Sequence, residues 1–224
     1  VLDYPVNVRV LIKKFSAQDE VKVIGAKEEF AYAFSAVRCK YFKSAVVNLG
    51  KEILVPSAVT GKGAWNCSSV NDDRVLTDSY TLKAQNQFLY VNGKKYWDEI
   101  TLVPRGKELA LVNRVPVEKY LVGLVNREIH SSYPKEAIKA QVVAARSYAL
   151  AMIADRQNPN RYFDLFGSEL DQVYQGAEYD DYKSALMVSQ TQDEVLLYKK
   201  DVLKAYYHAS SGGFSELPQN VWPN

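Results

Sequence analysis

The feature that most constrains the fold of this sequence is a change of hydrophobic period at Pro116. Before Pro116, apolar and polar side chains alternate, as in residues 6–12, which is the period of a half-buried β-strand. After it, apolar residues recur at helical spacing: Val117, Tyr120, Leu121, Leu124 and Val125. The sequence therefore predicts an α+β protein, with a β-rich region at residues 1–114 and a region of helices and a C-terminal hairpin at residues 115–224.

The β-rich region contains further strand signals. Residues 21–23 alternate as a second strand would, and the Asn-Gly pair at 92–93 stands between apolar runs, as at the turn of a hairpin. We expect strands to continue to about Val112. Residues 28–34 fit a helix or a strand, and the Gly- and Ser-rich residues 56–69 favour a loop.

The helical region predicts three helices. The first begins after Pro116 and ends near Ile129. Ser132 is the expected N-cap of the second helix, which carries an apolar face and ends at the Asn-Pro pair at residues 158–159. The third helix covers about residues 180–190.

Two apolar runs near the C-terminus, residues 195–198 and 203–207, predict a hairpin around residues 200–201. A Ser-Ser-Gly-Gly turn follows at residues 210–213. The neighbouring His208 would suggest a Ser-His-Asp hydrolase. However, neighbours at one strand end rarely face each other and the chain has no nucleophile-elbow pattern, so we disfavour this class.

Composition excludes several function classes. The basic residues are spread along the chain and the net charge is only +2, so we predict no nucleic-acid partner. No run approaches the roughly 18 apolar residues that span a bilayer. Because the sequence begins at Val1 rather than Met, we expect any signal or anchor segment to lie outside it.

The two cysteines leave one question open. Cys39 and Cys67 fit one disulfide in an oxidising compartment and equally fit two buried thiols. His130 and His208 lie at no usual zinc spacing from them, so we predict no metal site and no cofactor.

Glu128 is the most informative single residue. It lies four residues after Leu124 on the apolar stripe of the first helix, so its carboxyl should face the core or a cleft. Burial and the helix macrodipole both favour the protonated form at this C-terminal position. A glutamic acid that keeps its proton is what glycosidic cleavage needs as a general acid. The structural alternative is a buried ion pair with Arg127 or Arg146.

Arg146 lies on the flank of the apolar face of the second helix, eight residues after Ile138, where a charged side chain must be paired. It could orient Glu128, bind a substrate, or serve only as a structural arginine. The sixteen tyrosines would suit a carbohydrate groove or fill the core.

The segment VPVEKYLVGLVNREIHSSYPKEAIKAQVVAARSYAL, residues 115–150, resembles the SpoIID/LytB family of peptidoglycan lytic transglycosylases. The resemblance continues through DQVYQGA at residues 171–177, the hairpin and Ser-Gly motif at 195–213, and the Val-Trp pair at 221–222, about half of the chain. It implies an extracytoplasmic enzyme of the periplasm or cell wall. It also implies cleavage between the N-acetylmuramic acid and N-acetylglucosamine of peptide-stripped glycan strands, with an anhydro-sugar product.

The resemblance also implies site residues. It places the family's catalytic acid at Glu128, with a mechanism that needs a single carboxyl group. It implies substrate contacts at Arg146, Tyr148, Gln172, Tyr174, Tyr206, Ser210, Ser211 and Gly212. This chain departs from the family pattern where Ile129-His130 stand in place of Met-Pro, and it lacks the His/Cys zinc cluster of some members.

Two other functions remain open at this stage. A glycan-binding module that stimulates a cell-wall amidase would use Glu128 for binding only. A muramidase that hydrolyses with water would need a second carboxylate near Glu128, for which Asp171 and Glu169 are candidates.

Overall fold

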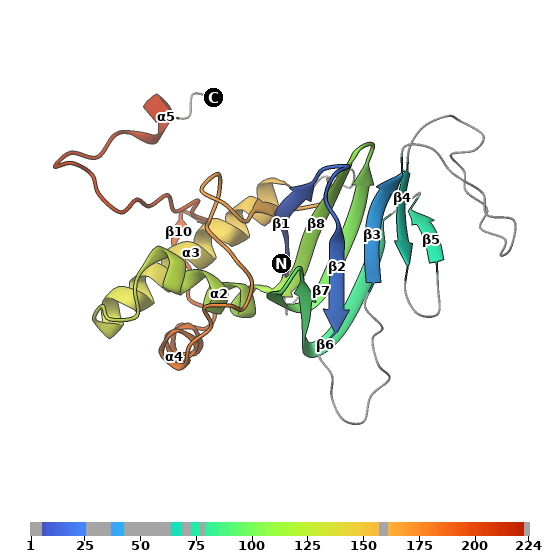
Figure 1. Ribbon diagram of the computed structural model, residues 1–224. Coiled ribbons are helices and arrows are strands. Elements are labelled where there is room, and N and C mark those ends of the chain that lie inside the picture. The colour runs from blue at the N-terminus through green and yellow to red at the C-terminus, as the bar shows by residue number, and fades with distance from the viewer. Residues whose placement is uncertain are drawn as a thin grey trace, which may run out of the picture.

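The fold is built on one large, mostly antiparallel sheet with a group of helices beside it (Figure 1). The computed structural model describes residues 6–25, 37–42, 64–68, 73–76, 79–156 and 161–221. The sheet has nine strands in the order β5-β4-β3-β2-β6-β7-β8-β1-β9, and two further strands form a separate hairpin. The predicted α+β class is confirmed.

The strands are β1 (Asn7–Phe15), β2 (Val21–Gly25), β3 (Val37–Phe42), β4 (Ala64–Ser68), β5 (Asp73–Leu76), β6 (Tyr80–Val91), β7 (Lys94–Arg105), β8 (Glu108–Pro116), β9 (Leu165–Phe166), β10 (Leu197–Tyr198) and β11 (Asp201–Val202). The helices are α2 (Val117–Glu128), α3 (Lys135–Asp155), α4 (Tyr182–Gln190) and α5 (Pro218–Val221).

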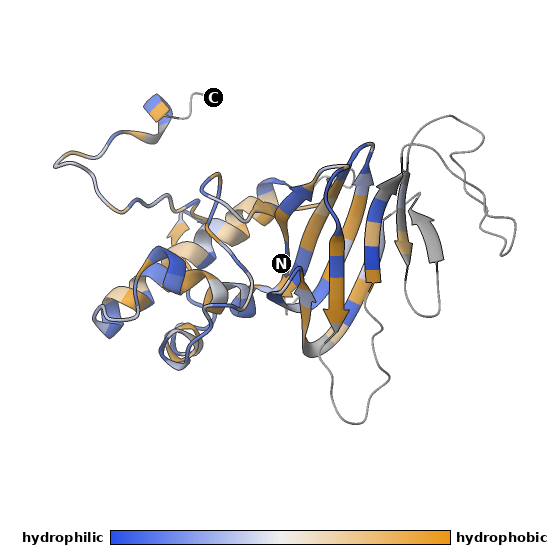
Figure 2. Ribbon diagram, in the orientation of Figure 1, coloured by the Kyte–Doolittle hydropathy of each residue, from blue (hydrophilic) through white to orange (hydrophobic). Residues whose placement is uncertain are grey.

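The alternating pattern forms the strands that it predicted. Val8 and Val10 of β1 are fully buried, and the hydropathy colouring alternates along the strands of the sheet (Figure 2). At the β6–β7 turn, Asn92 and Gly93 both have positive φ, 47° and 85°, as a tight type I′ hairpin turn requires. The last strand before the helices runs to Pro116, four residues beyond the predicted end.

One predicted loop is partly a strand. Residues 64–68 of the Gly- and Ser-rich stretch form β4, because Trp65 and Cys67 alternate inward and are buried. The rest of that stretch, up to residue 63 and at residue 69, lies outside the described residues, as does the undecided segment at residues 28–34.

Cys39 and Cys67 form a disulfide. They are directly opposite each other in the β3–β4 pair, with Cα atoms 4.1 Å apart, and both are buried. The structure thus selects the disulfide over two free thiols.

Helix α2 begins and ends where the sequence predicted, but the start of α3 differs. Pro134 precedes α3 without any side-chain cap, and the Ser132 hydroxyl instead lies 2.9 Å from His130 Nδ1. The predicted Ser132 cap is therefore wrong, because Pro134 occupies the N-cap position and Ser132 lies two residues before it. The helix ends at Asp155, and the expected stop at residues 158–159 lies outside the described residues.

The C-terminal hairpin is shorter than predicted. Only β10 and β11 pair, around a turn at Lys199-Lys200 rather than residues 200–201. Leu197 and Tyr198 are exposed, so their apolar character does not mark a buried strand. Residues 203–207 instead run back along the helices without forming a strand.

Helix α3 is the single helix of the described residues that is long and apolar enough to cross a membrane. Its most apolar window has a mean hydropathy of 1.2 and is half buried inside the protein. The sequence expectation concerned an unbroken run of about 18 apolar residues, and α3 is not such a run, because Lys139, Gln141 and Arg146 interrupt it. A core helix meets the same criterion, and here Ile138, Val142 and Ala149 are fully buried against neighbouring elements.

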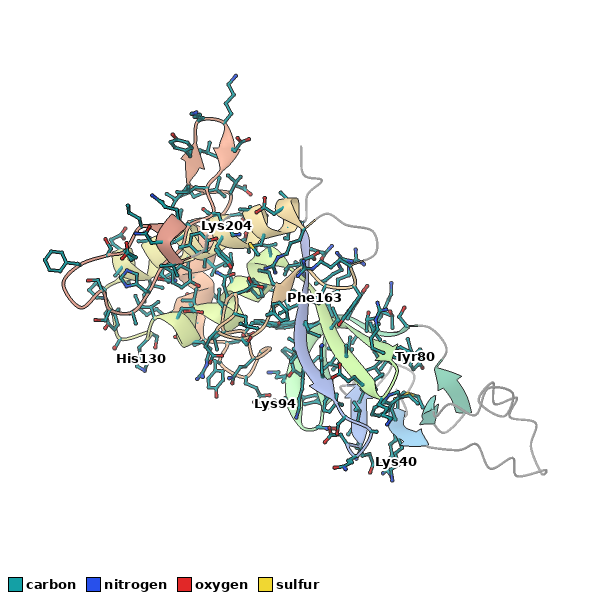
Figure 3. All side chains as sticks on the ribbon, turned by 90° about the horizontal axis from the view of Figure 1, so that it is seen from above. Lys40, Tyr80, Lys94, His130, Phe163 and Lys204 are labelled. Carbon is teal, nitrogen blue, oxygen red and sulfur yellow. A yellow bond between two sulfur atoms is a disulfide. The ribbon has the colours of Figure 1, made fainter. Side chains whose placement is uncertain are left out.

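The buried apolar residues form two main cores, and one of them joins the helices to the sheet. Helices α2 and α3 share one core with β1 and β8, through side chains such as Val8, Val115 and Leu124. The other core lies on the sheet alone and includes Trp65 and Ile100. Seen from above, His130 and Lys204 lie with the helices, whereas Tyr80 and Lys40 mark the far part of the sheet (Figure 3).

The two predicted regions contact each other directly within the sheet. The predicted boundary at residues 114–115 falls inside β8, and β1 pairs with β9 from the second half. Arg9 Nη2 of β1 also lies 2.6 Å from Asp164 Oδ1. The division into two domains stays a prediction.

Candidate functional site

Glu128 is the last residue of α2, and its side chain is half-buried. The backbone turns to an extended conformation at Ile129, so the carboxyl group stands where the helix stops. The backbone N–H of Val173 donates to Glu128 Oε1 at 2.9 Å, and the Tyr207 hydroxyl is a hydrogen-bond partner of the same carboxyl group. The segment 171–177 thereby comes to lie against the end of α2.

The surroundings of Glu128 raise the pKa of its carboxyl group. Burial is the largest cause, and the negative charge of Glu169 acts in the same direction. The hydrogen bonds from Val173 and Tyr207 and the positive charge of Arg127 oppose it and lower the pKa. The net result is an acid that keeps its proton to higher pH than an ordinary glutamic acid.

A network of buried polar groups lies behind Glu128. The Tyr120 hydroxyl donates to Gln172 Oε1 at 2.9 Å. Gln172 Nε2 donates to the Ala145 carbonyl at 3.2 Å and to the Tyr207 hydroxyl at 3.0 Å. Both Tyr120 and Gln172 are almost fully buried, so this network is part of the core and not of the surface.

Next to this network lies a pocket of about 280 Å³. Its walls come from the end of α3, the segment 169–171 and the segment 204–207, and consist of Tyr148, Met152, Arg156, Glu169, Leu170, Asp171, Lys204, Tyr206 and Tyr207. Tyr207 lines this pocket and is also a hydrogen-bond partner of the Glu128 carboxyl group, so the pocket and the acid are adjacent.

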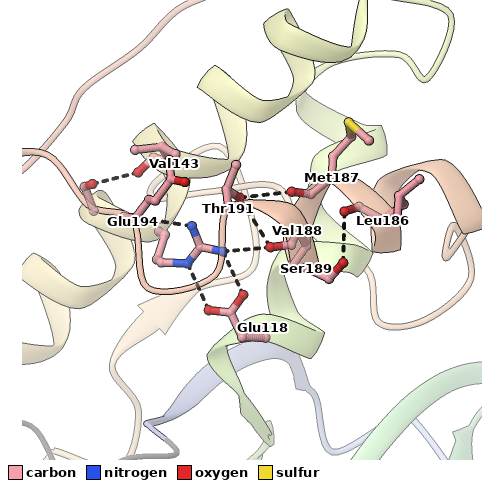
Figure 4. A network of polar contacts seen from close by, with 10 residues as sticks. Glu118, Val143, Leu186, Met187, Val188, Ser189, Thr191 and Glu194 are labelled. Carbon is pink, nitrogen blue, oxygen red and sulfur yellow. Dashed lines mark hydrogen bonds and ion pairs between the residues drawn. The ribbon is translucent and has the colours of Figure 1, made fainter.

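Arg146 does not pair with Glu128. Its side chain is 1% exposed, and its Nε and Nη2 atoms donate to the two carboxylate oxygens of Glu118 at 2.9 and 2.7 Å. The guanidinium also donates to the Glu194 and Val188 carbonyls (Figure 4). Of the roles left open for Arg146, the pairing with Glu128 is not formed, because Glu118 in the first turn of α2 faces α3 and takes the guanidinium. Buried in this way, Arg146 has no surface to offer a substrate.

Asp171 is equally occupied. Its carboxylate accepts from Arg156 at 2.7 Å, from the Tyr148 hydroxyl at 2.8 Å and from the Phe166 N–H at 2.8 Å, with its side chain 1% exposed. Of the two carboxylates considered for water activation, Asp171 is therefore a structural group. Glu169 is exposed at the pocket, and its charge acts on Glu128.

The other predicted contact residues divide into two groups. Gln172 and Tyr174 are buried, and the Tyr174 hydroxyl donates to Asn113 Oδ1 at 2.8 Å, so neither presents a surface for a substrate. Tyr206 lines the pocket, 40% exposed, with its ring edge-on to Tyr148 at 5.7 Å.

The Ser-Gly turn stands apart from the pocket. Ser210, Ser211 and Gly212 are exposed, and they are not among the residues of the pocket wall. Gly212 and Gly213 have positive φ, and the Gly213 N–H donates to Ser211 Oγ at 3.3 Å, as in a tight turn.

Sequence reasoning considered Tyr207 only as one of the sixteen tyrosines and did not predict its contact with Glu128. A signal was present, because neighbouring residues of an extended chain face opposite sides. Of the adjacent tyrosines Tyr206 and Tyr207, one should therefore face solvent and the other the interior, and the structure assigns the inner position to Tyr207. Among the described residues, no group of three or more His, Cys, Asp or Glu side chains gathers as metal ligands would.

Comparison with known proteins agrees with this geometry. The family model SpoIID, described as "Stage II sporulation protein", matches residues 105–198, a segment that contains α2, α3 and Glu128. An uncharacterized protein of Brachyspira hyodysenteriae is 32% identical over 154 residues, which is 68% of this chain and 41% of that protein. The Stage II sporulation protein D of Bacillus subtilis is 24% identical over 50% of this chain and 36% of its own length.

The amidase enhancer of Bacillus subtilis is 27% identical over 223 residues, which is 95% of this chain and 30% of that protein. The chain thus spans less than half the length of each of these relatives. Of the motifs that the sequence shares with the family, the segment 171–177 and Tyr207 lie against the end of α2, where Val173 and Tyr207 contact Glu128. Through the segment 105–198, the chain belongs to the SpoIID family.

Proposed function

We propose that this protein acts on the bacterial cell wall as a peptidoglycan lytic transglycosylase, with Glu128 as its general acid and base. The observation that carries the proposal is a half-buried carboxyl group with a raised pKa, held at a helix end beside a tyrosine-lined pocket. Relatives named for sporulation stage II and for enhancing an amidase support a role at the cell wall.

The reaction needs one carboxyl group. Protonated Glu128 gives its proton to the glycosidic oxygen as the bond from that oxygen to the anomeric carbon of N-acetylmuramic acid breaks. The C6 hydroxyl oxygen of the same sugar then bonds to the anomeric carbon, and the Glu128 carboxylate takes the hydroxyl proton. The acid is thus regenerated without water, and the product carries a 1,6-anhydro ring.

The pocket suits a sugar ring. Tyr206 offers an exposed aromatic ring on which the C–H face of a pyranose can pack, and Tyr148 supports it from the edge. Arg156 and Asp171, which also line the pocket, form an ion pair at 2.7 Å. The disulfide between β3 and β4 agrees with an oxidising, extracytoplasmic compartment, where peptide-free glycan strands would be found.

A second function is favoured by one observation. The similarity to the amidase enhancer covers nearly the whole chain, whereas the sporulation protein matches half of it. In this case the pocket would bind glycan strands and a cell-wall amidase would be the partner, with Glu128 contributing only to binding.

The deciding experiment is mass spectrometry of purified, peptide-free glycan after incubation with the wild type, Glu128→Gln and Glu136→Gln. Glu136 is the matched control, because its side chain is 82% exposed on α3 and pairs with Lys139 of the same helix. We expect anhydro products from the wild type and the control and none from Glu128→Gln.

The other outcomes separate the alternatives. Products with free reducing ends would mean hydrolysis and would point to Glu169 as the base that activates water. Binding without any products, together with stimulation of a cell-wall amidase, would replace the transglycosylase by the amidase-stimulating module.

A further inference from the structure

The buried amide of Gln172 has only one orientation that satisfies its neighbours. The Ala145 carbonyl oxygen can only accept a hydrogen bond, so the amide nitrogen of Gln172 must face it. The amide oxygen then faces the Tyr120 hydroxyl, which donates to it. A backbone carbonyl of α3 therefore fixes the direction of the whole chain of hydrogen bonds.

This direction continues to Tyr207. The second N–H of Gln172 Nε2 donates to the Tyr207 hydroxyl oxygen at 3.0 Å. A phenol has one hydrogen, and the amide N–H facing its oxygen cannot accept it. Among the described residues, the other hydrogen-bond partner of Tyr207 is the Glu128 carboxyl group, so the hydrogen points there.

We infer that Gln172 and Tyr207 are positioning residues for Glu128: Gln172 sets the direction of the Tyr207 hydroxyl, which donates its only hydrogen to the Glu128 carboxyl group. Together with the N–H of Val173, this donor holds the carboxyl group in one orientation at the pocket. The catalytic meaning of this arrangement rests on the proposed function, but the arrangement itself does not.

The charged groups around Glu128 determine how the pKa of its carboxyl group changes when the Tyr207 hydroxyl is removed. Arg127 of α2 and Glu169 of the segment before Gln172 face the carboxyl group with opposite charges, and Tyr120 and Tyr207 are uncharged. A donated hydrogen bond favours the ionised form. Without it, burial and Glu169 act with less opposition, so the pKa of Glu128 rises.

The test is a carbon-13 NMR titration of the Glu128 carboxyl group, whose signal is assigned by its absence in Glu128→Gln. Tyr207→Phe should raise the pKa by roughly half a unit to one unit, the size of one net hydrogen bond. Gln172→Met should raise it by less, because the Tyr207 hydroxyl can then turn away. In the Tyr207→Phe background, Gln172→Met should add nothing, because Gln172 acts through Tyr207.

Tyr148→Phe is the matched control for this measurement. It removes another pocket hydroxyl, but that hydroxyl donates to Asp171, so the pKa of Glu128 should stay unchanged. If Gln172→Met fails to fold because the Tyr120 hydroxyl loses its acceptor, Gln172→Met with Tyr120→Phe removes both partners and repeats the comparison.

An unchanged pKa in Tyr207→Phe, or equal effects of Gln172→Met with and without the Tyr207 hydroxyl, would overturn the inference. The titration does not depend on turnover. If the pKa pattern is found but Glu128→Gln still cleaves glycan, the proposed function fails and the positioning of Glu128 stands.

Discussion

Replacing Glu118 by Gln should destabilise the protein, although Glu118 lies away from the pocket. Glu118 neutralises Arg146, which is 1% exposed and donates two short hydrogen bonds to the Glu118 carboxylate. The amide of Gln can accept only one of them, and its NH₂ group meets a guanidinium donor. Removing one partner of a buried pair typically costs about 3–5 kcal/mol.

The Glu118 side chain is 29% exposed, so solvent reduces this cost. Arg146 also keeps its bonds to the Val188 and Glu194 carbonyls. We therefore expect a loss of about 2–3 kcal/mol, which for a chain of this size lowers the melting temperature by roughly 5–10 °C.

Urea denaturation and thermal melts of Glu118→Gln, Glu128→Gln and Glu136→Gln measure this loss. Glu128→Gln should stay close to the wild type, because Arg146 is not its partner, and Glu136→Gln serves as the exposed control. The folded fraction of Glu118→Gln should keep its turnover per molecule. Greater destabilisation by Glu128→Gln than by Glu118→Gln would refute the pairing described above.

Three further predictions follow from the site and the sheet. The Cys39→Ser/Cys67→Ser variant should lose about 3–4 kcal/mol of stability, because the disulfide closes a loop of 28 residues. It should keep its turnover, because β3 and β4 lie far along the sheet from Glu128, and a folded but inactive variant would contradict this. Glycan cleavage should continue in EDTA, and loss of activity restored specifically by zinc would show that a metal takes part. Because folding raises the pKa of Glu128, the folded state holds this proton more tightly than the unfolded state. Denaturation should therefore show the stability of the wild type falling relative to Glu128→Gln as pH rises from about 4.5, the ordinary pKa, through the raised pKa of the folded state. A parallel pH dependence of both proteins would disprove the shift.

The main elements of the fold could be predicted because they follow local rules. Alternation in residues 6–12 and the Asn-Gly turn at 92–93 marked strands of the sheet, and the 3.6-residue period after Pro116 marked α2. The misjudged elements are those that local pattern does not define. Residues 64–68 form a strand that pairs with β3 over five residues and is joined to it by the disulfide. The apolar residues Leu197 and Tyr198 suggested a longer, buried strand, but both are exposed.

The position of Glu128 could also be predicted from sequence. A carboxylate on the apolar stripe of a helix must face a core or a cleft, and periodicity alone indicates that. The same argument placed Arg146 correctly in the interior.

Only the tertiary structure decided which groups meet. Arg146 pairs with Glu118 rather than Glu128, because both acids lie on α2 and the crossing of α2 and α3 determines which one faces the guanidinium. In the same way, Tyr207 reaches Glu128 from a position 79 residues away along the chain, and Gln172, 44 residues away, contacts Tyr207. Helical period specifies which side of one element a residue faces, whereas contacts between elements depend on how the elements pack, and that information is not local in the sequence.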